Sequence, residues 1–188
     1  KNKLTFLVFQ RFSEVDLHPD RLTNHDMGYV FEELIRKFNE ENNESPGEHY
    51  TPREIVNLMT RLMVEPDKAR LEKPGLILQV LDPCCGTGGM LTICKSSIED
   101  INQKAIVQIS GQELNPKTYA ISKSDMLISA EDCNDADRIK LGNTLSNDQF
   151  AGETYHYMLA NPPYGIDWSS AHAEVSAEHD MGDQGRFG

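Results

Sequence analysis

Long hydrophobic runs are missing from this 188-residue sequence. No apolar stretch approaches the roughly 20 residues that a membrane-spanning helix needs. The opening residues 1–11 also lack the cleavage pattern of a signal peptide. We therefore expect a cytoplasmic protein with no membrane segment.

Cysteine is scarce, with four residues in the whole chain. Cys84 and Cys85 are adjacent, whereas Cys94 and Cys133 are isolated, and this spacing is typical of neither a disulfide framework nor a paired zinc motif. The six histidines are scattered and add no ligand pattern. We expect no metal site.

Basic residues are also few, because 18 Lys and Arg face 30 Asp and Glu and leave a net charge of −12. Residues 131–188 carry eleven acidic and three basic side chains. Nucleic-acid phosphates attract basic surfaces, so this charge balance argues against a protein that binds nucleic acid without a partner. A subunit that relies on a partner for phosphate contacts remains consistent with it.

The most informative motif is Asn161-Pro162-Pro163-Tyr164, directly after the apolar run 157–160. Two successive prolines stiffen the turn and remove two backbone donors. The Asn161 amide oxygen and the Pro162 carbonyl can then accept both hydrogens of one planar NH2 group, and Tyr164 offers an aromatic face for stacking. This combination is typical of a site for a flipped nucleobase. The alternative is an ordinary turn at the end of a strand.

A second motif lies upstream, where a strand-like run over 76–81 is followed by the glycine-rich turn Asp82 to Gly89 and a helical stretch over about 90–101. Glycines allow a ligand to approach the backbone, and a helix N-terminus favours an anionic group. Strand, glycine turn and helix together predict a nucleotide-binding α/β unit.

Two further polar residues follow predicted strands. Glu113 comes after a strand-like run over 106–110, at about the 25-residue spacing from the glycine turn at which an acidic side chain takes ribose hydroxyls. A solvated carboxylate is the alternative for Glu113. Asn143 follows the run 138–141, where its amide would read an adenine ring or simply form a turn.

The two motifs together favour one cofactor. A nicotinamide dinucleotide would explain the glycines and Glu113 but would leave Asn161 to Tyr164 without a role. S-adenosylmethionine explains both, because its ribose suits Glu113 and its sulfonium needs an incoming nucleophile such as an amine.

Over most of its length, the chain resembles a known family, the methylation subunits of type I restriction-modification systems. These subunits are adenine-specific DNA methyltransferases that use S-adenosylmethionine. The motifs that carry the resemblance occur in the family's order, at residues 47–54, 82–89, 111–115, 142–145 and 161–164.

The resemblance implies roles for particular residues. Together with the motif analysis it predicts cofactor binding by Glu48, His49, Tyr50, Thr51, Pro52, Arg53, Asp82, Gly86, Thr87, Gly88, Gly89, Glu113 and Asn143. The target adenine is expected at Asn161, Pro162, Pro163 and Tyr164. The implied partners are DNA, a DNA-reading specificity subunit and a restriction subunit.

The expected fold is α/β, a Rossmann-like methyltransferase with a partial parallel sheet in the order 3-2-1-4 and a fourth strand over 155–159. We divide the chain into a helical lead-in (1–46) and a partial catalytic domain (47–188), with 166–188 a loop or disordered.

Local patterns predict the remaining elements. Apolar spacing predicts helices over about 24–42, from Thr51 onward and over about 115–129, whereas 131–137 is expected to be a solvated loop. At the second helix, Thr51 as N-cap, Pro52 at the first helical position and Glu54 form the pattern of a capping box.

Three other functions remain open. The same turn serves enzymes that methylate glutamine side chains in proteins or amines in RNA, since the geometry suits any planar NH2. Pro83-Cys84 resembles the thiolate motif of cytosine carbon-5 methyltransferases, although here it lies in the cofactor turn. A non-catalytic scaffold is the third. Because family members have further strands, we expect the isolated chain to methylate no DNA.

Overall fold

The computed structural model describes residues 2–16, 18, 20–22, 26–27, 30, 33–34, 37, 51–129 and 134–187. The helix expected over about 24–42 lies largely outside the described residues. Glu48, His49 and Tyr50 lie entirely outside them. Within these ranges, no helix combines the length and the apolar character needed to cross a membrane.

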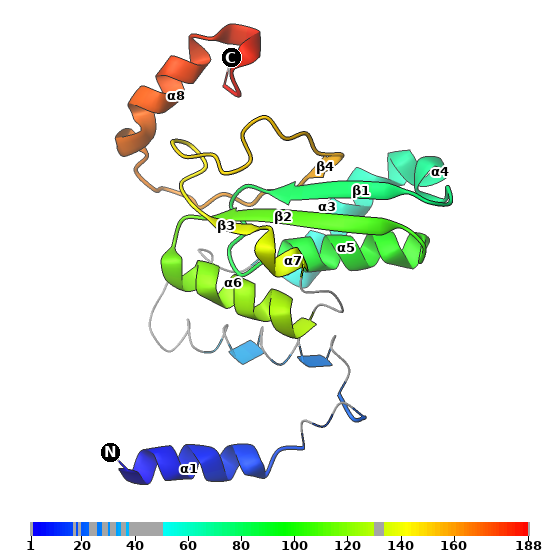
Figure 1. Cartoon of the computed structure of the whole chain (residues 1–188), viewed down its shortest axis with the longest axis vertical. Coiled ribbons are helices and arrows are strands. Elements are labelled where there is room, and N and C mark those ends of the chain that lie inside the picture. Colours follow the sequence, from blue (N-terminus) through cyan, green and yellow to red (C-terminus); the bar gives the residue numbers. More distant parts are fainter. Residues whose placement is uncertain are drawn as a thin grey trace.

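A four-stranded parallel sheet in the order β3-β2-β1-β4 organises the chain (Figure 1). The central strands β1 (Ile77–Asp82) and β2 (Ile106–Glu113) pair along their whole length, from Ile77 opposite Ile106 to Asp82 opposite Gly111. The outer strands β3 (Ile139–Leu141) and β4 (Tyr157–Met158) are short. The predicted strand order is confirmed, and β2 continues to Glu113 because its last residues pair with β3.

Helices cover one face of the sheet. The helix α5 (Gly89–Ile101) packs against both central strands and against α3 (Arg53–Val64), and α6 (Pro116–Ser129) lies beside β2 and β3. Short helices link these elements: η1 (Glu65–Asp67), α4 (Lys68–Leu71) and α7 (Asn134–Asp137). The predicted alternation of strand and helix is therefore confirmed in this part of the chain.

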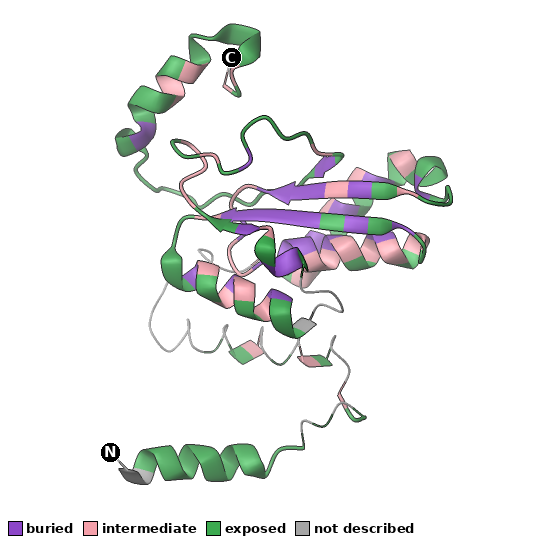
Figure 2. Cartoon of the chain, in the orientation of Figure 1, coloured by how far each residue is buried: buried purple, intermediate pink, exposed green. Residues whose placement is uncertain are grey.

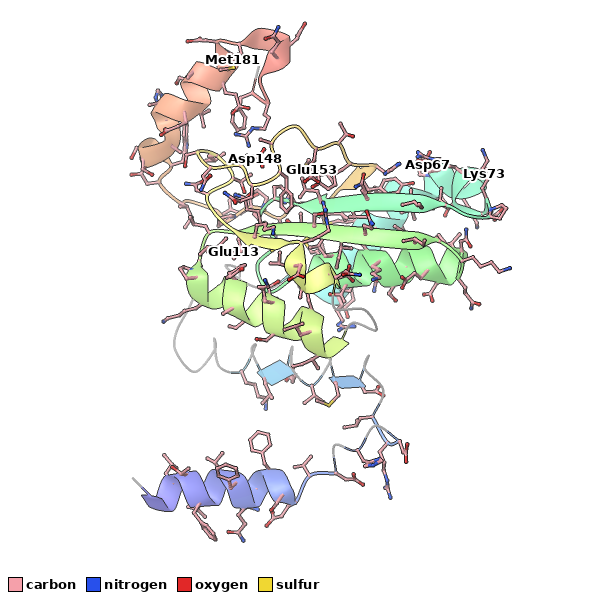
Figure 3. All side chains as sticks on the ribbon, in the orientation of Figure 1. Asp67, Lys73, Glu113, Asp148, Glu153 and Met181 are labelled. Carbon is pink, nitrogen blue, oxygen red and sulfur yellow. The ribbon has the colours of Figure 1, made fainter. Side chains whose placement is uncertain are left out.

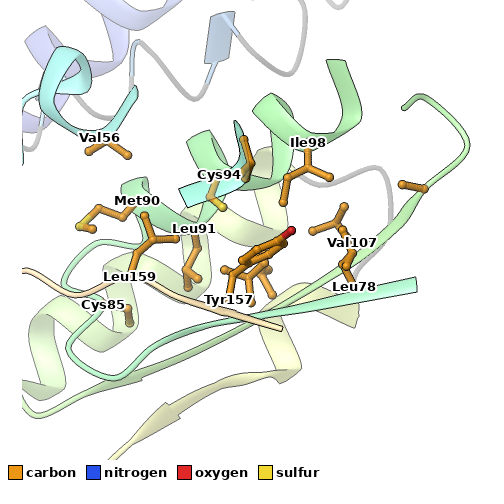
Figure 4. Packing of buried hydrophobic residues seen from close by; sticks show 14 of the residues in the cluster. Val56, Leu78, Cys85, Met90, Leu91, Cys94, Ile98, Val107, Tyr157 and Leu159 are labelled. Carbon is orange, nitrogen blue, oxygen red and sulfur yellow. The ribbon is translucent and has the colours of Figure 1, made fainter. Parts of the chain in front are cut away.

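The core lies between the sheet and this helical layer (Figure 4). Alternate strand residues point into it, because successive side chains of a strand face opposite sides. The helix α5 contributes residues at intervals of three and four, as one face of a helix requires. Buried members of this cluster include Val56, Leu78, Val80, Leu91, Cys94, Ile98, Val107, Ile109 and Tyr157.

The opposite face of the sheet is less covered. Ile77, Ile106 and Met158 each expose more than half of their surface, at 54%, 58% and 59%. Figure 2 shows exposed segments on the central strands and along α1 (Asn2–Ser13) from its third residue onward, and this helix lies away from the sheet. On α1, Phe6 and Phe9 are 69% and 73% exposed.

The capping box expected at Thr51 is wrong. The helix α3 begins at Arg53, Pro52 occupies the cap position, and no side chain of the described residues caps the helix. Proline fixes φ and suits the residue at which a chain enters a helix, so Pro52 starts α3 without help from a hydroxyl. The hydroxyl of Thr51 makes other contacts, described below.

The solvated loop expected over 131–137 is wrong for its second half. Residues Asn134–Asp137 form α7, in which Ala136 is buried and Asp135 is 8% exposed. Lys95 of α5 pairs with Asp135, with 2.6 Å between Nζ and Oδ2. The ion pair offsets the cost of burying the Asp135 carboxylate. The acidic composition of this stretch alone predicts that its side chains would be exposed to solvent.

The loop or disorder expected over 166–188 is also wrong for much of that range. The structure has η2 (Ser169–Ala171), α8 (His172–His179) and η3 (Gly182–Gln184). Residues 172–179 contain helix-forming Ala and Glu but no apolar stripe, so periodicity gave no helix signal. Contacts of Arg186 fix this segment, since its guanidinium bonds Glu178 at 2.7 Å and the Thr144 carbonyl at 2.7 Å.

Candidate active site

The candidate residues gather at one edge of the sheet. Asp82 ends β1, Glu113 ends β2, Asn143 follows β3 and Asn161 follows β4. The carboxyl ends of parallel strands meet at the same edge, which is where ligands bind in open α/β sheets. Figure 3 shows Glu113 at this edge and Asp67 and Lys73 at the other end of the strands.

The glycine turn after β1 needs its glycines for two physical reasons. Gly86 and Gly88 have φ of 56° and 89°, a left-handed conformation that other residues adopt at a cost. A Cβ on Gly88 would lie 2.5 Å from Met126 Cε, so this glycine also allows α5 to approach α6 closely. Among the described residues, a Cβ on Gly89 would meet no atom within 4 Å, so no described side chain packs against the first turn of α5 at this point.

Glu113 is held against this turn by both of its oxygens. Its Oε2 accepts a hydrogen bond from the Gly86 N–H at 2.9 Å, and its Oε1 accepts one from the Asn115 N–H at 2.7 Å. Each carboxylate oxygen has capacity for a further donor. Two oxygens in fixed positions suit the paired hydroxyls of a ribose, so Glu113 fits the nucleoside part of the expected cofactor.

Asp82 is almost completely buried, at 1% exposure. Its Oδ1 accepts the Cys84 N–H at 3.0 Å, whereas its Oδ2 is buried with no hydrogen-bond partner among the described residues. Burial raises the pKa of Asp82 to about 7, against the lowering effect of the Cys84 hydrogen bonds, and the nearby Glu113 raises it further. A buried carboxylate oxygen without a partner, such as this Oδ2, fits a ligand that brings a donor or a positive charge.

The loop after β3 is tied to the glycine turn. Thr144 donates a hydrogen bond from Oγ1 to the Pro83 carbonyl, and Gln112 of β2 donates to the Asn147 carbonyl at 2.8 Å. The Asn143 Oδ1 accepts the Leu145 N–H at 3.0 Å. Asn143 therefore forms a local turn, which was the predicted alternative to a contact with an adenine ring. The link through Thr144 joins segments far apart in the chain, and no local pattern could have revealed it.

Asn161 touches both upstream motifs. Its Nδ2 donates to Thr51 Oγ1 at 2.9 Å, and its backbone hydrogen-bonds the Cys84 thiol. Thr51 Oγ1 in turn donates to Met90 Sδ at 3.7 Å, in the first turn of α5. The segment before α3, the glycine turn and the residue that opens the proline turn therefore meet at one place.

The remaining predicted residues surround this junction. Pro162 and Pro163 are exposed, and Tyr164 presents 95% of its surface to solvent. Pro52 and Arg53 follow Thr51 at the start of α3, and Thr87 lies within the glycine turn. The structure thus brings Thr51, the turn from Asp82 to Gly89, Glu113, Asn143 and the proline turn together. Their roles in binding a cofactor or a base stay predictions.

Cys84 lacks the properties of a catalytic nucleophile. Burial raises the pKa of its thiol to about 12, and Asp82 contributes to the rise. The thiolate is the nucleophilic form of cysteine, and it is scarce near neutral pH for such a group. This disfavours the cytosine carbon-5 chemistry that Pro83-Cys84 suggested. In the part of the chain described here, no three His, Cys, Asp or Glu side chains cluster as metal ligands would.

Known proteins with similar sequences are methylase subunits of type I restriction enzymes. The MjaIX methylase subunit of Methanocaldococcus jannaschii is 27% identical over 161 residues, which cover 84% of this chain and 26% of the relative. The EcoEI methylase subunit of Escherichia coli is 28% identical over 166 residues, covering 84% of this chain and 31% of the relative. The chain thus spans roughly a quarter to a third of the length of these relatives.

Solved structures share the fold. The methyltransferase subunit of a type I restriction-modification system from Streptococcus thermophilus superposes with a TM-score of 0.67 at 23% identity, over 90% of this chain and 34% of that one. A putative class I S-adenosylmethionine-dependent methyltransferase from Listeria monocytogenes gives 0.65 at 14% identity, over 87% and 46%. Both confirm the methyltransferase fold class expected from the motifs.

The sequence model of the family described as N-6 DNA methylase matches residues 22–185. That range includes the segment before α3, the glycine turn, Glu113 and the proline turn, and it covers most of the chain. On this match, the chain belongs to the N-6 DNA methylase family.

Proposed function

We propose that this chain forms the catalytic core of a type I methylation subunit and transfers a methyl group from S-adenosylmethionine to the 6-amino group of adenine in DNA. The observation that carries the proposal is the hydrogen bond from Asn161 to Thr51, which joins the proline turn to the segment before α3. Thr51 in turn contacts Met90 in the first turn of α5, directly after the glycine turn. A residue that holds an amine and residues that hold a methyl donor must be neighbours for transfer to occur.

The cofactor would lie along the carboxyl edge of the sheet. Glu113 would take the ribose hydroxyls, Gly88 and Gly89 would border the methionine part, and the unpaired Oδ2 of Asp82 would face a donor group. When bound, S-adenosylmethionine supplies an electrophilic methyl group on a sulfonium. Asn143 would contribute near the adenine ring of the cofactor, and Pro52 and Arg53 would close the site from the start of α3.

The target adenine would be flipped from the duplex onto the proline turn. The Asn161 side-chain oxygen and the Pro162 carbonyl would accept the two hydrogens of its amine, which directs the nitrogen lone pair toward the methyl donor. Pro163 keeps the turn rigid. The 95% exposed ring of Tyr164 provides a face on which the base would stack. The amine would lose its proton after methyl transfer, so the chemistry needs no strong base.

DNA affinity would come largely from partner subunits. The chain has a net charge of −12, whereas DNA binding depends on neutralising phosphates with Lys and Arg. The relatives are named as subunits of type I restriction enzymes, which supports assembly with a specificity subunit and a restriction subunit. We place this assembly in the cytoplasm, where DNA is accessible.

The test is methylation by the chain assembled with its specificity subunit, using a tritium-labelled methyl donor and DNA, a protein release factor or RNA as substrates. Mass spectrometry of the DNA nucleosides should identify N6-methyladenine. Label in protein glutamine or RNA instead would favour the other amine methyltransferases. Cofactor binding without transfer to any of these substrates would contradict the proposal and favour a scaffold.

A further inference from the structure

We propose that Thr51 is a positioning residue that fixes the orientation of the Asn161 amide, so that the amide presents its oxygen to the target amine. This inference rests on the proposed function. It assigns Thr51 a role different from the cofactor contact that the family resemblance implies. The two residues are 110 positions apart in the chain and are joined by a 2.9 Å hydrogen bond from Asn161 Nδ2 to Thr51 Oγ1.

The Thr51 hydroxyl is available for this contact because α3 does not use it. A threonine before a helix commonly caps the first backbone N–H groups. Here the helix starts at Arg53 after Pro52, and Thr51 forms no side-chain cap on it. The hydroxyl lies instead between Asn161 and Met90, so its position is set by tertiary contacts.

The direction of the hydrogen bonds matters because a hydroxyl has a single proton. Thr51 directs that proton to Met90 Sδ at 3.7 Å, and Met90 is 6% exposed within the core. A hydroxyl whose proton is engaged offers acceptor lone pairs to its other neighbour. It therefore favours the NH2 group of Asn161 over the oxygen, and so selects one of the two orientations of the amide.

The selected orientation is the one that amine binding requires. An asparagine amide has two donors on nitrogen and an acceptor oxygen. With Nδ2 held by Thr51, Oδ1 is the atom left to accept from an amine. The reversed amide would direct its NH2 group at the amine of adenine, donor against donor, and would instead favour a base with an oxygen at that position, such as hypoxanthine.

The first test uses Thr51→Val, which keeps the shape of the side chain but removes the hydroxyl, and Thr51→Ser, which keeps the hydroxyl. In the assembled enzyme, Thr51→Val should lower single-turnover methyl transfer about tenfold, since a neutral hydrogen bond and the alignment it provides are lost. Cofactor affinity should change by less than about twofold. Thr51→Ser should restore most of the rate.

The second readout is base preference, which a purely structural role would leave unchanged. Wild-type enzyme should bind DNA with adenine at the target position more tightly than DNA with hypoxanthine there. Thr51→Val should lose much of this preference, by about fivefold to tenfold, and Thr51→Ser should keep it. An unchanged preference and rate in Thr51→Val would overturn the inference, as would a loss of cofactor affinity that matches the loss of rate.

A third measurement needs no catalysis. The side-chain NH2 signals of Asn161 in a nitrogen-15 NMR spectrum of this chain can be assigned by their loss in Asn161→Asp. They should shift toward values of a solvated amide in Thr51→Val and stay in place in Thr51→Ser. Absence of any shift in Thr51→Val would overturn the inference. Absence of methylation by wild-type enzyme would instead count against the proposed function.

Discussion

Glu113 at the end of β2 accepts a hydrogen bond from the Gly86 N–H at 2.9 Å, which couples two neighbouring strands at the edge where ligands bind. This bond places a carboxylate directly against the glycine turn. The same carboxylate also receives the Asn115 N–H at 2.7 Å, so neither oxygen is free to rotate away. The acidic side chain is thereby positioned before any ligand arrives.

Replacing Glu113 with Gln should weaken S-adenosylmethionine binding by about 1.5–3 kcal/mol, the range for hydrogen bonds to a charged group. Isothermal titration calorimetry on wild type and variant measures the difference. Glu153→Gln is the matched control, because Glu153 pairs with Arg138 at the amino end of β3. Equal affinities for wild type and Glu113→Gln would contradict a role in cofactor binding and would favour the interpretation of Glu113 as a solvated carboxylate.

Replacing Gly88 with Ala should destabilise the fold by about 2–4 kcal/mol, since the new Cβ adds left-handed strain and overpacks the core. The φ of this residue is 89°, and the Cβ would lie 2.5 Å from Met126 Cε and 2.9 Å from Ser122 Oγ. Urea denaturation followed by circular dichroism measures the loss.

Gly89→Ala separates folding from binding at the neighbouring position. A Cβ there would meet no atom of the described residues within 4 Å, so stability should not fall. Cofactor affinity should decrease if the ligand occupies that space. Equal destabilisation by the two alanine substitutions would contradict the steric account of the turn.

The stability conferred by Asp82 should decrease as pH rises. Burial raises its pKa from an ordinary value of 3.8 to about 7, so the folded chain holds this proton more tightly than the unfolded chain between those values. The contribution of Asp82 is therefore most favourable below about pH 4, falls as pH rises, and reaches its minimum above about pH 7.

Asp82→Asn removes this titration, and the measurement is urea denaturation at pH 5 and pH 8. The free energy of unfolding of the variant, relative to wild type, should increase from pH 5 to pH 8. The exposed Asp183→Asn serves as control. A difference between Asp82→Asn and wild type that is the same at both pH values would show that Asp82 does not retain its proton in the folded chain.

Local sequence patterns predicted much of the fold. The apolar run before the glycine turn, the run before Glu113 and the helical spacing after each are properties of short windows, and the structure has β1, α5, β2 and α6 there. The order β3-β2-β1-β4 followed from the handedness of parallel crossovers together with the family resemblance. Motifs placed directly after strands came together because parallel strands share a carboxyl edge.

Features that depend on distant partners were not predicted. The local sequence predicts that the Thr51 hydroxyl caps a helix. In the structure it instead contacts Asn161 and Met90, which lie far along the chain. Residues 172–179 form α8 with support from Arg186, whose contact with Glu178 is not visible as periodicity. Asp135 is similarly buried because Lys95 on another helix pairs with it. In each case a tertiary contact outweighs the local preference.

Exchange of Asn161 for Ala tests adenine methylation by the proline turn most directly. Single-turnover transfer of a labelled methyl group to DNA by the assembled enzyme should fall by about 10²-fold or more, because an aligning hydrogen bond to the amine is lost. Cofactor affinity should stay nearly unchanged, since the Asn161 side chain hydrogen-bonds Thr51 and would hold the base rather than the cofactor. Methyl transfer at a near-normal rate by Asn161→Ala would contradict the assignment of this turn as the site that holds the adenine.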